Sequence, residues 1–211
     1  MGKLIPFYGE ENPELFEIER RCMDREGKVI SCLDKSLPFG PVLDVGAGNG
    51  FTAHKLNHNG RLVVAMEPNE KMVDLCNPLV WSKGFAQDIP FHTDAFQAAY
   101  ATWAFFFDGI TDLDEGLAEL ERVVEAGGKM IVVDNFGQDE FSTFTNQNLA
   151  SNVSNWAERG FSHEVIETAF VFDSVAEGRK LFTFYFGKNA EKLTTTRIGY
   201  NVVAYTKFNK K

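Results

Sequence analysis

Cysteine and histidine are scarce in this sequence of 211 residues, which holds three cysteines and four histidines. Cys22, Cys32 and Cys76 form no CxxC pair, and no histidines stand at the spacing of zinc ligands. A chain of this length buries enough surface to fold without disulfides. We therefore expect reduced thiols and no metal site, as in a cytosolic protein.

Long apolar runs are also lacking. The longest stretches, residues 98–107 and 130–133, fall far short of the ~20 residues that a membrane-spanning helix needs. Residues 1–6 contain no apolar core of a signal peptide. We expect no membrane span and a cytoplasmic location.

Basic residues are outnumbered by acidic ones. The 21 lysines and arginines face 30 aspartates and glutamates, for a formal net charge of −9. Such a surface repels phosphate backbones, so we expect no nucleic-acid partner. The one basic cluster, residues 207–211, is interpreted as a solvated tail.

The apolar pattern alternates between strand and helix. We predict strands at 42–45, 62–66, 84–87, 95–103 and 130–134, and helices at 51–59, 69–76 and from Asp112 or Asp114 to Gly127-Gly128. Asn69 is the expected cap of its helix. Because the strands are apolar on both sides, the pattern predicts a Rossmann-like, doubly wound α/β fold. It has a mostly parallel, seven-stranded sheet with helices on both faces.

The two ends of the chain have an apolar pattern that differs from that of its middle. Residues 1–41 show a helical apolar stripe, and 139–159 are helix-like and could form a lid. Residues 163–172 and 197–208 alternate as strands around a helix at 175–186, which predicts an antiparallel C-terminal pair at one sheet edge. We expect a single domain, 1–211, made of an N-terminal helical cap (1–41), a core (42–136), and a lid helix with the strand pair (137–211).

The most informative segment is VLDVGAGNG, residues 42–50, between the first strand and a helix. Glycines there let a ligand lie against the backbone N–H groups. Gly46, Gly48 and Gly50 form GxGxG with Asp44 before them, and Phe51 stands where the dinucleotide fingerprint has its third glycine. A glycine turn that only serves packing is the alternative.

Two acidic residues follow the next strands. Glu67, before Pro68, ends the second strand, where a carboxylate can accept hydrogen bonds from both ribose hydroxyls. Asp88, before Ile89, follows the third strand and can accept from an adenine amine. A solvated strand end and a turn residue are the alternatives.

Together these residues resemble the class I S-adenosylmethionine-dependent methyltransferases, and within them the small-molecule group that includes the ubiquinone/menaquinone-biosynthesis methyltransferases. The resemblance covers residues 42–136 well. It implies methyltransferase activity with S-adenosyl-L-methionine as cofactor, the glycine loop around the methionine portion, Glu67 on the ribose and Asp88 on the adenine. The cofactor-binding residues it implies are Asp44, Gly46, Ala47, Gly48, Gly50, Glu67, Pro68, Asp88, Ile89, Thr102 and Trp103.

No catalytic residue is assigned from the sequence. The cofactor carries the activated methyl group, so the protein has to align the acceptor and exclude water. Relatives often carry a histidine pair after the fourth strand, where this chain has Phe105-Phe106-Phe107-Asp108. Asp108 and His92 are candidate bases, with solvated loops as the alternative, and Asn135 could orient an acceptor or simply end its strand.

Phenylalanines gather after strands four and five. If they line the ligand crevice rather than the core, the acceptor is a small, apolar or aromatic molecule. The residues concerned are Phe105, Phe106, Phe107, Phe136, Phe141 and Phe144. Phe7 and Tyr8 could cover the cofactor, or only pack.

Three other functions stay open. A nicotinamide-dependent oxidoreductase is disfavoured by GxGxG and Asp44. A non-catalytic cofactor-binding module is favoured by the missing polar residues at Phe106 and Phe107. An aminopropyltransferase lacks an acidic cluster for a polyamine. Oligomeric state, acceptor and methylated atom are not indicated.

Overall fold

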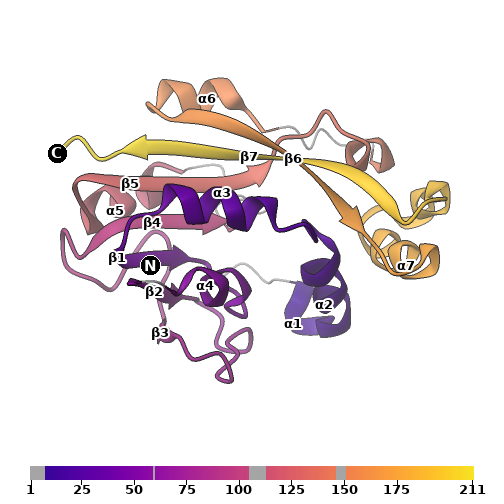
Figure 1. Ribbon diagram of the computed structural model, residues 1–211, viewed down its shortest axis with the longest axis horizontal. Coiled ribbons are helices and arrows are strands. Elements are labelled where there is room, and N and C mark those ends of the chain that lie inside the picture. The colour runs from indigo at the N-terminus through magenta and orange to yellow at the C-terminus, as the bar shows by residue number, and fades with distance from the viewer. Residues whose placement is uncertain (1–7, 59, 105–112, 146–150) are drawn as a thin grey trace.

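The computed structural model describes residues 8–58, 60–104, 113–145 and 151–211, and it shows a doubly wound α/β fold (Figure 1). One sheet of seven strands runs in the order β3-β2-β1-β4-β5-β7-β6. Its first five strands pair in parallel, β7 is antiparallel to β5, and β6 is antiparallel to β7. The strands are β1 Gly40–Val45, β2 Arg61–Met66, β3 Val80–Ser82, β4 Phe96–Thr102, β5 Val124–Asn135, β6 Ser162–Val171 and β7 Arg197–Phe208. The predicted fold class and the antiparallel C-terminal pair are confirmed.

Helices cover both faces of the sheet. They are α1 Tyr8–Glu11, α2 Pro13–Cys22, α3 Lys28–Ser36, α4 Phe51–Leu56, α5 Asp114–Val123, α6 Val153–Glu158 and α7 Val175–Phe186, with 3-10 turns η1 Phe141–Phe144 and η2 Gly187–Lys192. Successive residues of a strand point to opposite faces. In β1, Val42 joins the core under α2, α3, α4 and α7, while Leu43 joins the core under α5 and α6.

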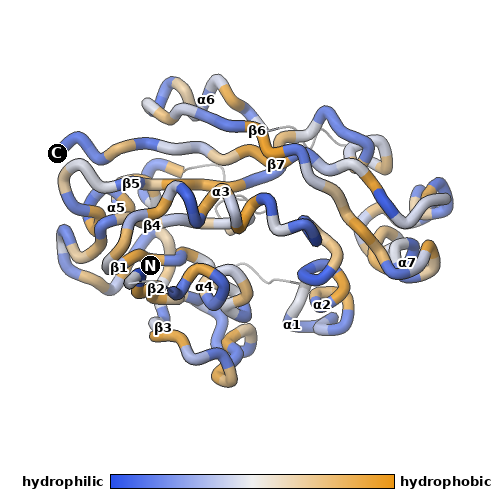
Figure 2. Tube along the Cα trace, in the orientation of Figure 1, coloured by the Kyte–Doolittle hydropathy of each residue, from blue (hydrophilic) through white to orange (hydrophobic). Residues whose placement is uncertain are grey.

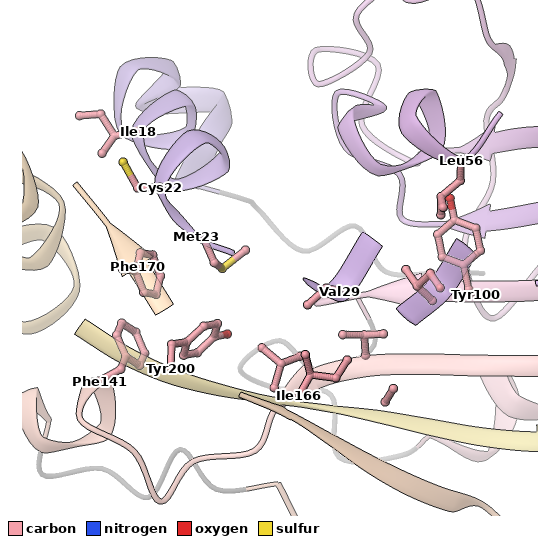
Figure 3. Packing of buried hydrophobic residues seen from close by; sticks show 14 of the residues in the cluster. Ile18, Cys22, Met23, Val29, Leu56, Tyr100, Phe141, Ile166, Phe170 and Tyr200 are labelled. Carbon is pink, nitrogen blue, oxygen red and sulfur yellow. The ribbon is translucent and has the colours of Figure 1, made fainter. Parts of the chain in front are cut away.

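The two cores follow from this alternation. Figure 3 shows the first one, where Val29 of α3 and Leu56 of α4 lie against the sheet. Figure 2 shows hydrophobic residues along β5 and mixed residues on α3 and α7, as expected for amphipathic helices on a buried sheet. No helix in the described ranges is both long and apolar enough to cross a bilayer.

Two of the predicted crevice phenylalanines belong to the core. Phe141 and Phe144 of η1 are 8% and 4% exposed. The Phe141 ring stacks on Phe170 at 5.2 Å and meets Phe182 edge-on at 5.5 Å. The packing interpretation is therefore correct for both rings, and they contribute burial energy rather than a ligand wall.

The segment after β2 does not form the helix predicted at 69–76. The Asn69 side chain accepts a hydrogen bond from Lys71 N (3.1 Å), and the Asp74 side chain accepts one from Cys76 N (2.9 Å). Such side-chain bonds compete with helical backbone bonds. Two short turns form instead, and they lead into Pro78.

The third strand lies at Val80–Ser82, before the predicted 84–87. Its pairing with β2, Val64 with Val80 and Met66 with Ser82, decides its position. Phe85 and Asp88 instead close a tight turn, in which Asp88 N donates to the Phe85 carbonyl at 3.0 Å. A Cβ on Gly84, just before this turn, would lie 2.6 Å from the Met66 Sδ. Local apolar character predicted a strand here, but the contact with β2 determines where it forms.

Helix α5 ends at Val123, short of Gly127-Gly128. Val124 already pairs with Phe96 of β4, and its carbonyl accepts a hydrogen bond from Asn209 Nδ2 at 2.7 Å. The Asn209 carbonyl also accepts from Gly127 N at 2.8 Å. A residue near the C-terminus therefore determines this helix end, which no local pattern could indicate.

The single helix predicted at 139–159 is also wrong. The described parts of this segment are η1 and α6, which are both short. Asp139 accepts from Ser142 N at 2.8 Å and closes the first turn, and the burial of Phe141 and Phe144 draws that turn into the core. The hypotheses from the sequence about Phe7, Phe105–Phe107, Asp108 and the Tyr8 side chain concern groups outside the described structure.

Candidate functional site

The glycine loop folds back onto the end of β2. Gly46 N and Ala47 N both donate to the Met66 carbonyl, at 2.9 and 3.0 Å. A Cβ on Gly46 would lie 2.4 Å from the Ala104 Cβ, and one on Gly50 would lie 2.7 Å from the Leu79 Cδ1. Glycine is thus required at both positions by close packing.

Gly48 differs from its neighbours. Its φ is +56°, but the nearest atom to a Cβ there is the Phe16 Cζ at 3.9 Å. Phe16 is therefore the one described side chain in van der Waals contact with this position. Unlike Gly46 and Gly50, Gly48 has room for a Cβ, so its backbone is less tightly packed than theirs.

Glu67 stands at the centre of this loop. Its Oε2 accepts a hydrogen bond from Gly48 N (2.8 Å) and its Oε1 accepts one from Asn69 N (2.9 Å). Burial of the side chain raises the pKa of this carboxyl, while the two backbone bonds oppose that rise. A carboxylate offers about four acceptor positions, so each oxygen can still accept from a hydroxyl group. Pro68 is half-buried between Glu67 and Asn69.

Asp44 lies beneath the loop and is 1% exposed. Its Oδ2 accepts from the Tyr100 hydroxyl at 2.9 Å, whereas its Oδ1 is buried with no hydrogen-bond partner. Burial raises the pKa of Asp44 to about 7. A buried acceptor without a donor is costly, so this oxygen is suited to a ligand N–H or O–H group.

Asp88 and Ile89 form a turn anchored by α5. The Asp88 side chain is exposed and that of Ile89 is buried. Ile89 N donates to the Glu119 carboxylate at 2.8 Å, and the Ile89 carbonyl accepts from Arg122 at 2.8 Å. Arg122 also lowers the pKa of Glu119. The arrangement holds one apolar and one acidic side chain at a rigid turn.

Thr102 ends β4, and Trp103 directly follows it. Trp103 has a φ of +50°, which is a strained conformation for a bulky residue and often marks a functional site. Its indole Nε1 donates to the Tyr200 hydroxyl (2.9 Å) and to the Asn135 Oδ1 (3.2 Å), and the Tyr200 hydroxyl itself donates to Asn135. The ring is thus held by residues of two other strands, β5 and β7.

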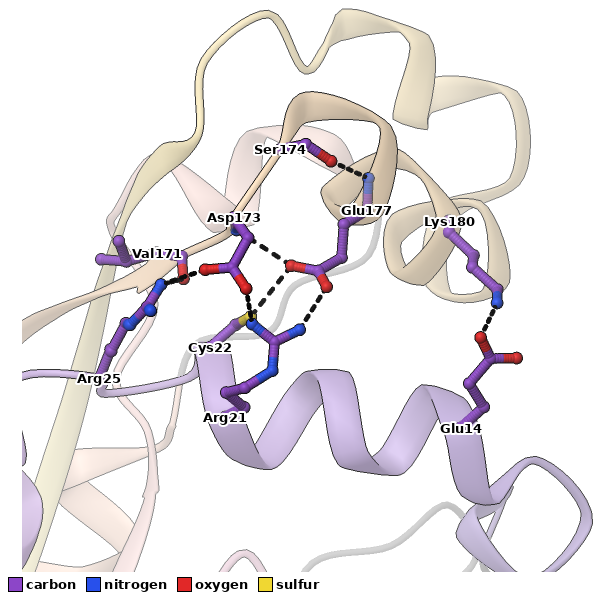
Figure 4. Close-up of polar contacts among 9 residues, drawn as sticks. All are labelled: Glu14, Arg21, Cys22, Arg25, Val171, Asp173, Ser174, Glu177 and Lys180. Atoms are coloured by element: carbon purple, nitrogen blue, oxygen red, sulfur yellow. Dashed lines mark hydrogen bonds and ion pairs between the residues drawn. The ribbon is translucent and has the colours of Figure 1, made fainter.

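Helix α2 carries groups that sequence analysis did not single out. The Arg20 guanidinium carbon lies 5.5 Å from the ring centroids of both Phe16 and Trp103. The helix is fixed by α7, since Arg21 pairs with Asp173 and Glu177 (Figure 4). Its apolar stripe predicted packing against the core, but no local signal indicated Arg20 or Tyr200 as site residues, because their partners are distant in the sequence.

The site as a whole lies at the end of the sheet where the parallel strands terminate. The parallel strands β1, β2, β4 and β5 present their carboxyl ends there, and α1 and α2 lie on the same side (Figure 1). His92 is exposed, with its ring bonded to the Thr93 carbonyl, so the solvated-loop interpretation fits it. Phe136 is half-buried and packs against the core of α5 and α6.

Comparisons with known proteins agree with this architecture. Residues 43–132 match the family model described as a methyltransferase domain. The chain is 29% identical over 160 residues to the ubiquinone/menaquinone biosynthesis C-methyltransferase of Geotalea daltonii, a match that covers 64% of this chain and 65% of that protein. It is 34% identical over 110 residues to the demethylmenaquinone methyltransferase of Corynebacterium kroppenstedtii, covering 50% and 44%. The chain thus spans less than two thirds of these curated relatives.

Solved structures share the fold. An S-adenosylmethionine-dependent methyltransferase of Thermotoga maritima superposes with a TM-score of 0.63 at 17% identity, over 96% of both chains. The YcgJ protein of Bacillus subtilis gives a TM-score of 0.60 at 15% identity, over 86% of this chain and 98% of that one. Residues 43–132 thus match a methyltransferase domain, and the described part of the chain has the fold of these solved methyltransferase structures.

Proposed function

We propose that this protein transfers the methyl group of S-adenosylmethionine to a small-molecule acceptor. The observation that carries the proposal is the Glu67 carboxylate at the tip of β2, which the N–H groups of Gly48 and Asn69 hold in place. A fixed carboxylate with free lone pairs can accept from both hydroxyls of a ribose.

The residues around Glu67 fit the rest of such a cofactor. The less tightly packed backbone at Gly48 and the unpartnered Asp44 Oδ1 suit its methionine portion, which brings an ammonium group. The anchored turn at Asp88 offers an acceptor for the adenine amine. The set we propose for cofactor binding is Asp44, Gly46, Ala47, Gly48, Gly50, Glu67, Pro68, Asp88, Ile89, Thr102 and Trp103.

The proposed methyl transfer depends little on side chains that act as acids or bases. The cofactor supplies an activated methyl group on a sulfonium. The protein holds the reactants in line and keeps water out, and proximity of this kind accounts for a large part of a barrier reduction. The fixed Trp103 ring and the Asn135 amide beside it are the groups we expect to orient the acceptor.

A small acceptor is favoured over nucleic acid or protein. Two of the relatives are named for quinone biosynthesis and for demethylmenaquinone methylation, which involve small molecules. The net charge of −9 disfavours polyanions. We propose action in the cytoplasm on a small, apolar or aromatic compound.

Two measurements test this function. Calorimetry should show binding of S-adenosylmethionine and S-adenosylhomocysteine, and no binding of NAD. Incubation with methyl-labelled cofactor and either a metabolite extract, RNA or total protein should move label into an extractable small molecule. Label in RNA or protein would overturn the acceptor class, and cofactor binding without any transfer would favour a non-catalytic binding module.

A further inference from the structure

Arg20 lies beside the proposed site, and within the described ranges of the chain no carboxylate pairs with it. Its Nε is buried and has no hydrogen-bond partner. Among the described residues the one polar contact of its guanidinium is from Nη2 to the Met23 Sδ, at 3.8 Å. Sulfur is a weak acceptor, so the cation is poorly satisfied.

The other arginines have stronger acceptors than a sulfur atom. Arg179 donates to the backbone carbonyls of Leu193 and Glu191. The arginines paired with a carboxylate are Arg21, Arg25, Arg61, Arg122, Arg159 and Arg197. The Glu19 carboxylate, next to Arg20 in the sequence, is engaged elsewhere, because it accepts a hydrogen bond from the Tyr185 hydroxyl at 2.6 Å. Because no carboxylate in the described part of the chain pairs with this guanidinium, its donors are available to an acceptor group of a ligand.

The position of Arg20 indicates which chemical group of a ligand it can bind. Its guanidinium carbon lies 5.5 Å from both the Phe16 and Trp103 rings, so the aromatic groups cover its faces. The Phe16 ring lies 3.9 Å from the Cβ position of Gly48, and Trp103 directly follows β4. Contacts of this kind leave the in-plane N–H donors available and partly remove water, which strengthens charge-assisted bonds to a planar, two-oxygen acceptor.

We propose that Arg20 is the carboxylate-recognising residue of this site. The carboxylate comes either from the amino-acid end of the cofactor or from the methyl acceptor, and both sources share the chemistry of a planar anion bound by the guanidinium edge. The inference rests on the proposed function, because that function brings a carboxylate-bearing ligand to the glycine loop.

The test compares ligands with and without a carboxylate. S-adenosylhomocysteine carries the amino-acid end, and 5′-methylthioadenosine has the same nucleoside without it. Benzoate and benzamide, added with and without saturating S-adenosylhomocysteine, probe a carboxylate on the acceptor side. The variant Arg20→Met keeps an apolar side chain between the two rings, and Arg197→Met removes an exposed arginine that pairs with Glu26.

For a cofactor carboxylate, Arg20→Met weakens S-adenosylhomocysteine binding at least ten-fold and leaves 5′-methylthioadenosine unchanged. For an acceptor carboxylate, both nucleosides bind as before, but the preference of the wild-type protein for benzoate over benzamide is lost. Arg197→Met changes none of these affinities. If neither effect occurs in Arg20→Met, the proposal is wrong.

Two controls keep the result interpretable. If Arg20→Met does not fold, Arg20→Lys keeps the charge but not the planar pair of donors, and the same ligand should lose several-fold in affinity. Failure of the wild-type protein to bind either nucleoside would refute the proposed function instead. The benzoate comparison without cofactor would then decide the inference on Arg20.

Discussion

The Tyr100 hydroxyl of β4 donates a hydrogen bond of 2.9 Å to the Asp44 Oδ2 of the adjacent β1, and both residues are fully buried. This bond is the only one to the Asp44 carboxyl within the described structure, because the Oδ1 has no partner. The pair lies directly below the glycine loop. An ionisable group with a single donor therefore links the core of the sheet to the proposed cofactor site.

The first prediction concerns the pH dependence of stability. Burial raises the pKa of Asp44 to about 7, while the unfolded chain has an ordinary aspartate. The folded state then binds a proton that the unfolded state has lost, so the free energy of unfolding should fall as the pH rises from about 5 to about 7. One such group contributes up to ~1.4 kcal/mol per pH unit.

Denaturant unfolding at several pH values measures this slope, and Asp44→Asn should make it shallower. Part of the slope should remain in this variant, because burial raises the pKa of Asp134 to about 7 as well. An unchanged slope in Asp44→Asn would show that Asp44 is ionised in the folded protein throughout this range.

A second prediction concerns Glu67. Glu67→Gln places an amide N–H group against one of the two backbone donors, Gly48 N or Asn69 N, and removes the charge. Loss of charge-assisted bonds costs about 1.5–3 kcal/mol, so binding of S-adenosylhomocysteine should weaken roughly 10- to 100-fold. Glu70→Gln is the matched control, because Glu70 is exposed and pairs with Lys83. Calorimetry with equal affinities for Glu67→Gln and the wild type would exclude Glu67 as a cofactor ligand.

Much of the sheet and of the glycine loop was predictable from the sequence. The strands β1, β2, β4 and β5 have apolar side chains on both faces, and the glycines of the loop after β1 all have positive φ, which a short glycine motif indicates. These features depend on residues that are neighbours in the chain, so a periodic pattern or a short motif records them.

What was missed depends on distant residues. The end of α5 is determined by Asn209, and the Trp103 ring is held by Tyr200, which lies on β7. The helix prediction for the segment after β2 was wrong for a local reason. The side chains of Asn69 and Asp74 accept hydrogen bonds from nearby backbone N–H groups, which compete with helical bonds. Arg20 was missed because its significance is the lack of a partner, which appears only in three dimensions.

A third prediction separates the two roles of glycine in the loop. Gly48 and Gly60 both have positive φ, +56° and +83°, and a Cβ added at Gly60 meets nothing within 4 Å while one at Gly48 meets only the Phe16 ring. Alanine at either position should therefore cost a similar ~1 kcal/mol of stability from backbone strain. Only Gly48→Ala should also weaken S-adenosylhomocysteine binding, because the methyl group enters the ligand space. Thermal unfolding and calorimetry measure the two effects, and equal binding by both variants would make Gly48 a structural residue only.

The last prediction concerns the attachment of α2 to α7. Arg21 of α2 pairs with Asp173 and with Glu177, whose carboxylate also accepts from Asp173 N at 3.0 Å (Figure 4). α2 carries Phe16 and Arg20 over the glycine loop, so loosening this helix should affect the site without touching it. We expect Arg21→Met to speed amide hydrogen exchange in α2 and to weaken cofactor binding several-fold, and added salt should weaken binding to the wild-type protein in the same direction.

Lys83→Met removes another surface ion pair, with Glu70, which does not involve α2, and serves as the control. It should leave exchange in α2 unchanged. If Arg21→Met behaves like Lys83→Met, the ion pairs contribute nothing to the position of α2. The apolar contacts of Ile18 and Cys22 with the core would then be sufficient to hold the helix over the site.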